Sequence, residues 1–210
     1  MIIANWKMNM TLAEAKLFLQ RFHPKKDCAI CAPFTLLQFL HEQKNLHIKI
    51  GAQNLFYEQK GAYTGEISPA MIKEFAEYVI IGNSERRKLF HETDEIVEKK
   101  LKAAVSAGLI PILCVSSFEQ LPSDACDTLY VAYEPVASIG TGNAADPKEI
   151  NVILKKIRAI VNAKNLVLLY GGSVTSMNAK EYLEQPEING LLVGGASLNP
   201  DELLKIIQAQ

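Results

Sequence analysis

The stretch Ile2-Ile3-Ala4-Asn5-Trp6-Lys7-Met8-Asn9 decides between the two folds that the rest of the chain allows. Its first five residues are mostly apolar and predict a buried strand, and polar residues follow at once. An open doubly wound sheet that binds a nucleotide would carry a glycine-rich turn, G-x-G-x-x-G, directly after its first strand. The first glycine of this chain is Gly51. The stretch therefore favours a closed barrel over an open sheet.

Apolar runs alternate with amphipathic segments along the whole chain. Most of these runs are almost continuously apolar, as expected of parallel strands that are buried on both faces. The eight candidate strands are Ile2–Trp6, Cys28–Ala32, His47–Ala52, Tyr78–Gly82, Ile110–Val115, Thr128–Tyr133, Leu166–Tyr170 and Gly190–Gly194. This α/β alternation predicts a closed (β/α)8 TIM barrel that spans residues 1–210 as a single domain.

Polar capping residues mark the starts of the helices between these strands. Thr11 is followed three residues later by Glu14, which is the pattern of a capping box. Proline suits the first position of a helix, and Pro69 and Pro147 each follow a capping residue. The segments expected to be helical are 12–22, 69–75, 94–106 and 147–161, and two more helices are expected to open at Thr175 and at Asn199-Pro200.

The connection after the fifth strand is short. A barrel of this kind normally takes about 250 residues, with a floor near 200, and the chain has 210. Only the 12 residues Ser116–Asp127 join the fifth and sixth strands, and Pro122-Ser123-Asp124 interrupt any helix there. A parallel crossover needs about a dozen residues. We therefore expect the helix after strand five to be shortened or missing, with a gap in the outer ring beside strands five and six.

The composition excludes several classes of protein. Apolar residues make up 49% of the chain and charged residues 21%, which is typical of a soluble globular protein. A net charge of −1 argues against a nucleic-acid or anionic-membrane partner. The longest mostly apolar run, Ala103–Val115, is too short to cross a bilayer, and Lys7 interrupts any signal-peptide core. We expect a cytoplasmic protein.

The four cysteines are too few for a disulfide scaffold. Cys28 and Cys31 have the CxxC spacing of redox and zinc sites, but they lie in a predicted strand, where residues three apart point to opposite faces. We expect buried, reduced thiols and no metal site.

Polar and glycine residues follow the predicted strands at their C-terminal ends, where barrel enzymes place their active sites. Glu134 follows an apolar strand, so burial would make its carboxylate a stronger base; the alternative is a buried ion pair with a lysine or arginine. The glycine pairs 171–172 and 194–195, together with the hydroxyl of Ser173, favour a phosphate site; each pair alone is more often just a tight turn. Lys7 would place a cation beside them, unless it is an exposed surface lysine.

Together these residues resemble the triosephosphate isomerase family over nearly the whole chain. The motifs that carry the resemblance are Ala4-Asn5-Trp6-Lys7-Met8-Asn9, Gly51-Ala52-Gln53-Asn54, Gly61-Ala62-Tyr63-Thr64-Gly65-Glu66, Ser84-Glu85-Arg86-Arg87, Ala132-Tyr133-Glu134-Pro135, Ile139-Gly140-Thr141-Gly142, Tyr170-Gly171-Gly172-Ser173-Val174 and Val193-Gly194-Gly195-Ala196-Ser197. The resemblance implies a barrel that interconverts dihydroxyacetone phosphate and D-glyceraldehyde 3-phosphate without a cofactor.

The resemblance also implies a role for each site residue. Glu134 matches the catalytic base, Lys7 the electrostatic lysine and Asn5 a substrate-contacting asparagine. The residues that match the phosphate grip are Gly140, Ser173, Gly194 and Gly195. The segment Glu134–Gly142 matches a closing lid, for which a plain surface loop is the alternative.

The resemblance implies a homodimer as well. The long connection Gln53–Glu66 matches the arm through which two subunits associate, with Thr64 reaching the partner's site near Asn5 and Lys7. A disordered surface loop is the alternative reading of this connection.

Three departures from the family pattern affect the chemistry. Asn83 stands where the family has the histidine that polarises the substrate carbonyl, and an amide has no titratable proton. None of the four histidines, His23, His41, His47 and His91, is expected to reach the site. We therefore expect Asn83 to take the catalytic position of that histidine in a slow isomerase. The alternatives are a non-catalytic, phosphate-binding dimeric barrel and, more distantly, another sugar-phosphate enzyme.

The other two departures concern the lid. Ala137 replaces a tryptophan of the family pattern, and Ser116-Ser117 replace a glycine and a glutamate after strand five. In the family that tryptophan and glutamate set the open position of the lid. Their loss predicts a looser lid.

Overall fold

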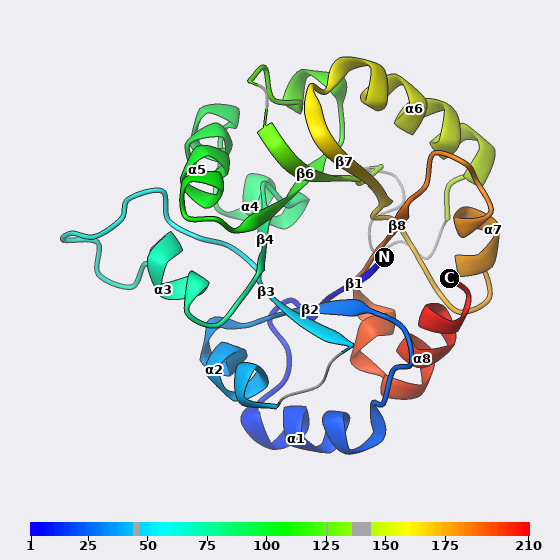
Figure 1. The fold of residues 1–210 in the computed structure, drawn as a ribbon, viewed down its shortest axis with the longest axis horizontal. Coiled ribbons are helices and arrows are strands. Elements are labelled where there is room, and N and C mark those ends of the chain that lie inside the picture. The colour runs from blue at the N-terminus through cyan, green and yellow to red at the C-terminus, as the bar shows by residue number, and fades with distance from the viewer. Residues whose placement is uncertain (44–46, 125, 136–143) are drawn as a thin grey trace.

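The structure, a computed structural model, describes residues 1–43, 47–124, 126–135 and 144–210. Within these residues eight parallel strands close into a barrel, because β8 pairs back onto β1 with Leu191 opposite Ile2 (Figure 1). The strands are β1 Ile2–Asn5, β2 Cys28–Ala32, β3 Ile48–Ala52, β4 Tyr78–Ile81, β5 Ile110–Val115, β6 Cys126–Tyr133, β7 Ala163–Tyr170 and β8 Gly190–Val193. The predicted closed barrel is confirmed.

Two strands begin earlier than their apolar runs indicated. The pairing of β6 with β7 extends down to Cys126 opposite Ala163. Lys164 and Asn165 interrupt the apolar pattern but belong to β7. Asn165 pairs with Thr128 of β6, and its side-chain amide donates to Thr128 Oγ1 at 3.3 Å. Pattern alone missed these residues because this part of the pair faces solvent rather than the core.

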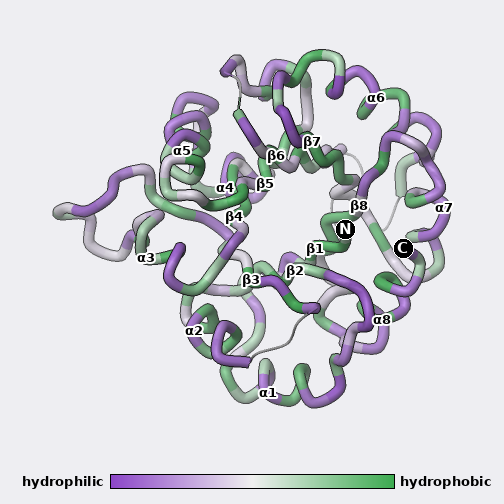
Figure 2. Tube along the Cα trace, viewed as in Figure 1, coloured by the Kyte–Doolittle hydropathy of each residue, from purple (hydrophilic) through white to green (hydrophobic). Residues whose placement is uncertain are grey.

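Helices surround the barrel in the order that the alternation predicts. They are α1 Leu12–Arg21, α2 Phe34–Glu42, α3 Pro69–Lys73, α4 Ser84–Leu89, α5 Asp94–Ser106, α6 Pro147–Ile160, α7 Ala179–Leu183 and α8 Pro200–Gln208. Thr11 forms the predicted capping box with Glu14, and Asp146 and Asn199 cap α6 and α8 with their side chains. These helices pack one face on the strands, so hydrophobic and hydrophilic residues alternate along them (Figure 2).

The predicted start of the penultimate helix is wrong. Thr175 does not open it, because its N–H donates to Asn178 Oδ1 at 2.8 Å in a turn that precedes the helix. The helix α7 begins only at Ala179. Two further short helices, α2 and α4, were not predicted: α2 follows Pro33 without a side-chain cap, and α4 is only six residues long.

The crossover between β5 and β6 holds a single 3₁₀ turn, Phe118–Gln120, among its described residues. The predicted shortening is therefore confirmed, and irregular chain lies between α5 and α6 in Figure 1. The outward faces of the two strands are nevertheless covered: Val115 is 2% exposed, and Leu129 and Val131 are fully buried. Leu121, from the crossover itself, packs on the same core. The ring thus lacks a helix here without leaving an exposed apolar face.

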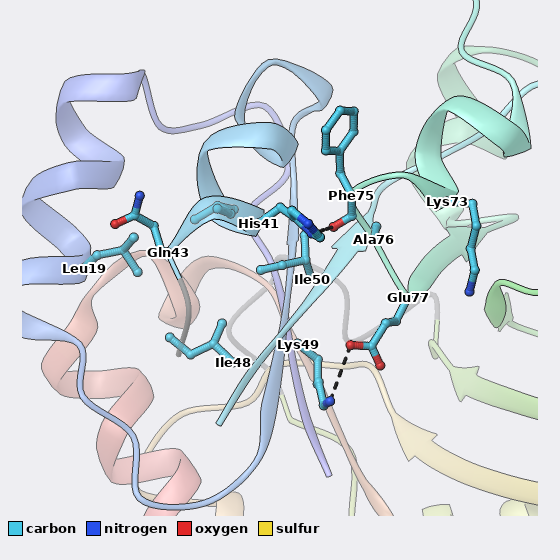
Figure 3. Close-up of a pocket in the computed structure, with 11 residues that line it drawn as sticks. Leu19, His41, Gln43, Ile48, Lys49, Ile50, Lys73, Phe75, Ala76 and Glu77 are labelled. Atoms are coloured by element: carbon cyan, nitrogen blue, oxygen red, sulfur yellow. Dashed lines mark hydrogen bonds and ion pairs between the residues drawn. The ribbon is translucent and has the colours of Figure 1, made fainter. Parts of the chain in front are cut away.

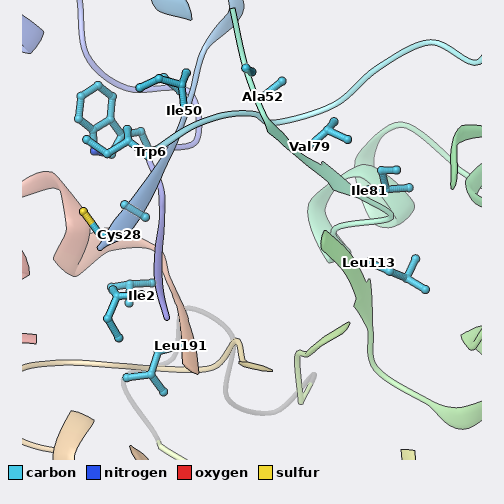
Figure 4. Close-up of a cluster of buried hydrophobic side chains, with 14 of the residues drawn as sticks. Ile2, Trp6, Cys28, Ile50, Ala52, Val79, Ile81, Leu113 and Leu191 are labelled. Carbon is cyan, nitrogen blue, oxygen red and sulfur yellow. The ribbon is translucent and has the colours of Figure 1, made fainter. Parts of the chain in front are cut away.

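The core has two layers, one between the strands and the helices and one inside the barrel. Figure 4 shows part of the outer layer, where Trp6, Cys28 and Ile50 lie on the side of the strands that faces the helices. Cys31 belongs to the inner layer instead. The prediction that the two thiols of the CxxC run point to opposite faces is confirmed. None of the described helices has the length and hydropathy that a membrane span requires.

Candidate active site

A cavity of about 420 Å³ lies at the C-terminal ends of the strands. Residues from the ends of five strands line it, namely Asn5, Lys7, Asn83, Ser84, Glu134, Gly171, Gly172, Ser173, Val174, Thr175, Leu192, Gly194, Gly195 and Ala196. Every predicted site residue that the structure describes is in this set. The remaining one, Gly140, lies outside the described residues, as does most of the predicted lid.

Lys7 is held in a strained backbone conformation at the rim of this cavity. Its φ of 53° lies in the left-handed region, which non-glycine residues rarely adopt. Asn5 Oδ1 accepts the Lys7 N–H at 3.0 Å, and the side-chain amide of Gln53 donates to the Lys7 carbonyl at 2.9 Å. The Lys7 ammonium forms an ion pair with Glu85, and its side chain is 34% exposed. These bonds fix a half-buried cation at the site, not a free surface lysine.

Glu134 is buried, with 5% of its surface exposed. Its carboxylate accepts two hydrogen bonds, from Asn83 Nδ2 at 2.8 Å and from the Ser84 N–H at 3.2 Å. Burial raises the pKa of Glu134, and the hydrogen bonds from Ser84 oppose that rise. Within the described part of the chain no lysine or arginine forms an ion pair with it. A desolvated carboxylate of this kind is suited to accept a proton.

Asn83 is fully occupied by contacts within the protein. It caps α4, because its Oδ1 accepts the Glu85 N–H at 3.2 Å. Its amide nitrogen donates to Glu134 Oε1 at 2.8 Å and contacts Cys114 Sγ at 3.8 Å. The two N–H bonds of the amide thus both have acceptors. In this conformation Asn83 holds the carboxylate of Glu134.

The four histidines all lie away from the cavity, as predicted. His23 and His41 contact backbone carbonyls, of Gln20 at 3.1 Å and of Phe75 at 3.1 Å. The His47 ring nitrogen Nδ1 contacts Asp27 Oδ1 at 2.9 Å at the opposite end of the barrel. His91 is exposed beyond the end of α4. None of them lines the cavity.

Steric contacts require glycine in the turn after β7 and are milder in the turn after β8. A Cβ on Gly171 would lie 2.8 Å from Glu134 Cγ, and one on Gly172 would lie 2.1 Å from the Tyr170 hydroxyl. A Cβ on Gly194 would lie 3.3 Å from Lys7 Cε. After Gly194 the chain forms the short 3₁₀ helix Gly195–Leu198, whose first residue lines the cavity. Exposed N–H groups beside a cation suit an anion such as phosphate.

The connection Gln53–Glu66 projects from the barrel beside α3 (Figure 1). Aromatic rings order it: Phe56 stacks on Tyr57 with centroids 4.4 Å apart and contacts Tyr63 at 4.7 Å. The Phe56 N–H also donates to the Ile67 carbonyl at 2.9 Å, which closes its base. The connection is thus a packed element, not the disordered loop of the alternative reading.

Sequence reasoning missed a buried polar network at the root of this connection. Lys100 is 3% exposed and donates to Asn54 Oδ1 at 2.7 Å. It also forms an ion pair with Glu92, which accepts a second ion pair from Arg86. Lys100 lies on the buried face of α5 with Val97 and Leu101, and its partners Asn54 and Glu92 lie outside the helices. Only their mutual contact in three dimensions identifies the network.

A second hollow, of about 330 Å³, lies at the other end of the barrel between α2 and α3 (Figure 3). Its charged groups have partners: Lys49 pairs with Glu77 at 3.4 Å, and Lys73 donates to the Gly108 carbonyl at 2.6 Å. The His41 ring contacts the Phe75 carbonyl. We therefore place the candidate active site at the C-terminal end of the strands.

Comparisons with known proteins agree with this placement. The family model described as triosephosphate isomerase matches residues 1–210. Curated triosephosphate isomerases of Trichodesmium erythraeum and Dictyoglomus thermophilum are 43% and 41% identical to the chain; the alignments cover 100% and 99% of the chain and 98% of each relative. The crystal structure of triosephosphate isomerase from Bartonella henselae superposes with a TM-score of 0.87 at 33% identity, covering 99% of this chain and 97% of that one.

The relatives are also longer. The alignment with the Trichodesmium protein runs over 238 positions, about 28 more than the 210 residues of this chain. A shortage of this size fits a barrel in which one crossover has lost its helix. The fold, the strand-end residues and the full-length match together establish that this chain belongs to the triosephosphate isomerase family and is an isomerase.

Proposed function

We propose that the chain interconverts dihydroxyacetone phosphate and D-glyceraldehyde 3-phosphate through an enediolate, and that Asn83 makes this reaction slow. The observation that carries the proposal is one cavity that holds a buried carboxylate, a cation and two glycine turns. The family acts on a phosphorylated triose. A cavity of about 420 Å³ has ample room for a three-carbon phosphate.

Glu134 is the proposed base. It takes a proton from C1 of dihydroxyacetone phosphate, the C–H electron pair forms the C1–C2 double bond, and the C2 oxygen takes up the negative charge. Return of the proton to C2 then gives the aldehyde. Since burial raises the pKa of Glu134, it accepts the proton more readily than an exposed glutamate would. Its bonds to Asn83 and Ser84 must be released for it to reach the substrate.

A second proton must move between the two substrate oxygens. A neutral imidazole can donate and accept that proton, whereas the amide of Asn83 has none to exchange. In this chain Glu134 is the proposed carrier for both transfers. A general acid–base group contributes roughly 10²–10⁴-fold to a rate, so the turnover of this chain is expected to be lower by that factor than that of an enzyme with histidine at position 83.

Lys7 and the glycine turns are proposed to bind the substrate. The Lys7 ammonium faces the developing charge on the oxygens, and Asn5, which accepts the Lys7 N–H, keeps that side chain in place. Ser173, Gly194 and Gly195 line the same cavity, with Gly194 beside the Lys7 side chain, and would hold the phosphate with N–H and hydroxyl groups. Gly140 is proposed to complete the grip from the lid. The set requires neither cofactor nor metal.

The family generally forms homodimers, and we propose the connection Gln53–Glu66 as the contact. Its aromatic residues are packed, yet Tyr63 at its tip is 44% exposed. Thr64 beside it is also exposed and is proposed to reach the partner's site near Asn5 and Lys7. Residues 1–210 are proposed to form a single domain in the cytoplasm, with no nucleic-acid or membrane partner.

The test is a coupled isomerase assay of the chain, of Asn83→His and of Glu134→Ala. We expect measurable turnover in the chain, a rise of roughly 10²–10⁴-fold in kcat for Asn83→His, and loss of turnover in Glu134→Ala. An Asn83→His variant with no increase in kcat would show that Asn83 does not limit the rate. Turnover of the chain no higher than that of Glu134→Ala would support the non-catalytic phosphate-binding barrel instead.

A further inference from the structure

The carboxylate of Glu202 reaches out of its own helix to a distant part of the chain. Glu202 lies in the first turn of α8, three residues after the capping residue Asn199. A glutamate at that position commonly folds back onto the N–H of the capping residue, as Glu14 does with Thr11 in α1. Glu202 instead accepts the N–H of Ser176 at 2.7 Å, 26 residues away in the sequence. Helix capping therefore does not explain its side chain.

Ser176 belongs to the turn after β7, and two other residues of this turn, Ser173 and Thr175, line the cavity. Asn178 holds the turn from within its own segment. Its Oδ1 accepts the Thr175 N–H at 2.8 Å, and its Nδ2 donates to the Ser173 carbonyl at 3.0 Å. Glu202 holds the next N–H along the chain, that of Ser176, from a separate helix. The position of the turn is thus tied to α8.

The start of α8 is in turn continuous with the turn after β8. The two glycines of that turn line the cavity, and the chain then runs through the 3₁₀ helix Gly195–Leu198 into the cap of α8. The Ser197 N–H donates to the Gly194 carbonyl at 2.8 Å, so this short helix begins directly at the cavity. The contact between Glu202 and Ser176 therefore joins the two turns that carry the proposed phosphate grip.

The charge of Glu202 and its hydrogen bond would affect phosphate binding in opposite directions. Hydrogen bonds from the N–H and the side chain of Ser176 lower the pKa of Glu202, so its carboxylate is ionised at neutral pH. Ser176 directly follows Thr175 of the cavity wall, and a negative charge this close to the cavity repels a phosphate. Removal of the charge alone would therefore tighten phosphate binding, whereas loss of a positioning contact would weaken it.

We propose that Glu202 is a positioning residue for the phosphate site: its hydrogen bond to Ser176 fixes the turn after β7 relative to the turn after β8, so that donors from both turns meet one phosphate. This inference rests on the proposed function. Glu202 is not among the described residues that line the cavity, so it acts through the turn and does not touch the substrate. A hydrogen bond to a charged group is stronger than a neutral one, which suits a contact between two separate turns.

The test compares Glu202→Ala with Asp201→Ala. Asp201 is the matched control, because it lies in the same helical turn, carries the same charge and pairs with Arg21 of α1. Both changes remove one negative charge from the start of α8, but only Glu202→Ala removes the contact with Ser176. Glu202→Gln, which keeps an oxygen acceptor, is the conservative variant.

The probe is 2-phosphoglycolate, a phosphate whose carboxylate imitates the enediolate, and its Kd is measured by titration calorimetry. Thermal unfolding is recorded for each protein in parallel. A hydrogen bond to a charged group is worth about tenfold to hundredfold in a binding constant. Because Asn178 still holds the turn, we expect part of this effect, a rise of about threefold to tenfold in the Kd of Glu202→Ala. Glu202→Gln should show a smaller rise, and Asp201→Ala should stay within about twofold of the parent.

Two results would overturn the proposal. One is a Glu202→Ala or Glu202→Gln protein that binds 2-phosphoglycolate as tightly as the parent or more tightly, whatever its thermal stability. The other is an equal rise in the Kd of Asp201→Ala, because the effect would then come from the charge at the start of α8 and not from the contact with Ser176.

The proposed function fails separately. If the parent chain binds the probe but shows no turnover above Glu134→Ala, the isomerase proposal fails while the Kd comparison still decides the role of Glu202. If the parent chain does not bind the probe, both proposals are overturned.

Discussion

Gly171→Ala tests whether the position of Glu134 limits the reaction. The added Cβ would lie 2.8 Å from Glu134 Cγ, about 0.7 Å inside the closest comfortable carbon–carbon separation of about 3.5 Å. The next contacts, the Tyr133 carbonyl at 3.5 Å and Glu134 Oε1 at 3.6 Å, are ordinary. The backbone of Gly171 is not in the left-handed region, so the alanine acts through this one contact.

Glu134 cannot yield freely, because its carboxylate is held by Asn83 and Ser84. A misplacement of about 1 Å in a reacting group costs up to about 10²-fold in rate, so a shift of about 0.7 Å predicts a tenfold to hundredfold loss of kcat. Overpacking costs about 1–3 kcal/mol of unfolding free energy, equivalent to a fall in Tm of about 2–12 °C for a chain of this size.

The assay is steady-state turnover below the Tm, with Gly195→Ala as the comparison. A Cβ on Gly195 meets no atom within 4 Å and projects where the phosphate is proposed to bind. We expect Gly195→Ala to raise KM chiefly and Gly171→Ala to lower kcat chiefly. A Gly171→Ala protein with kcat within twofold of the parent would refute the claim that Glu134 needs this space.

Further predictions concern charge, the root of the arm, the dimer and the lid. Because burial raises the pKa of Glu134 in the folded state, its ionised form destabilises the fold. Glu134→Gln should therefore raise Tm at pH 7. The gain in Tm should disappear as the pH falls through the raised pKa toward 4.5, which thermal melts across that pH range would show. Lys100→Met leaves Asn54 unpaired and removes one partner of the buried Glu92, so it should cost about 3–5 kcal/mol in chemical denaturation. Shortening Gln53–Glu66 to a tight turn should yield monomers by analytical ultracentrifugation, and an unchanged dimer would exclude it as the contact. A looser lid should let the enediolate lose its phosphate group more often, so the chain should form more of this elimination by-product per turnover than an ordinary isomerase does. An equal fraction of by-product would count against a looser lid.

Much of the barrel could be predicted because its strands are buried on both faces and leave an unmistakable apolar pattern. The position of the site could be predicted for a related reason, because the C-terminal ends of all the parallel strands lie at the same end of the barrel. Contacts between distant residues could not be predicted. Nothing in the local sequence of Asn83 shows that its amide nitrogen donates to Glu134. The sequence around Thr175 predicts a helix cap, but the Thr175 N–H donates to Asn178 Oδ1 in a turn that precedes the helix.

The short crossover also bears on how the chain folds. In a barrel, each new strand must find its neighbour across an intervening helix, and the entropy lost in closing that loop opposes the pairing. Each halving of the loop length lowers this opposition by about 0.6 kcal/mol. The sequence places only Ser116–Asp127 between the two strands. The paired residues, from Ile112 opposite Tyr130 to Val115 opposite Tyr133, are therefore close to one another in the sequence. Contacts of small separation form fastest. Because the helix is missing, β5 and β6 are the two neighbouring strands whose paired residues are closest in sequence. Hydrogen-exchange labelling during refolding should therefore find the backbone amides of this pair protected early.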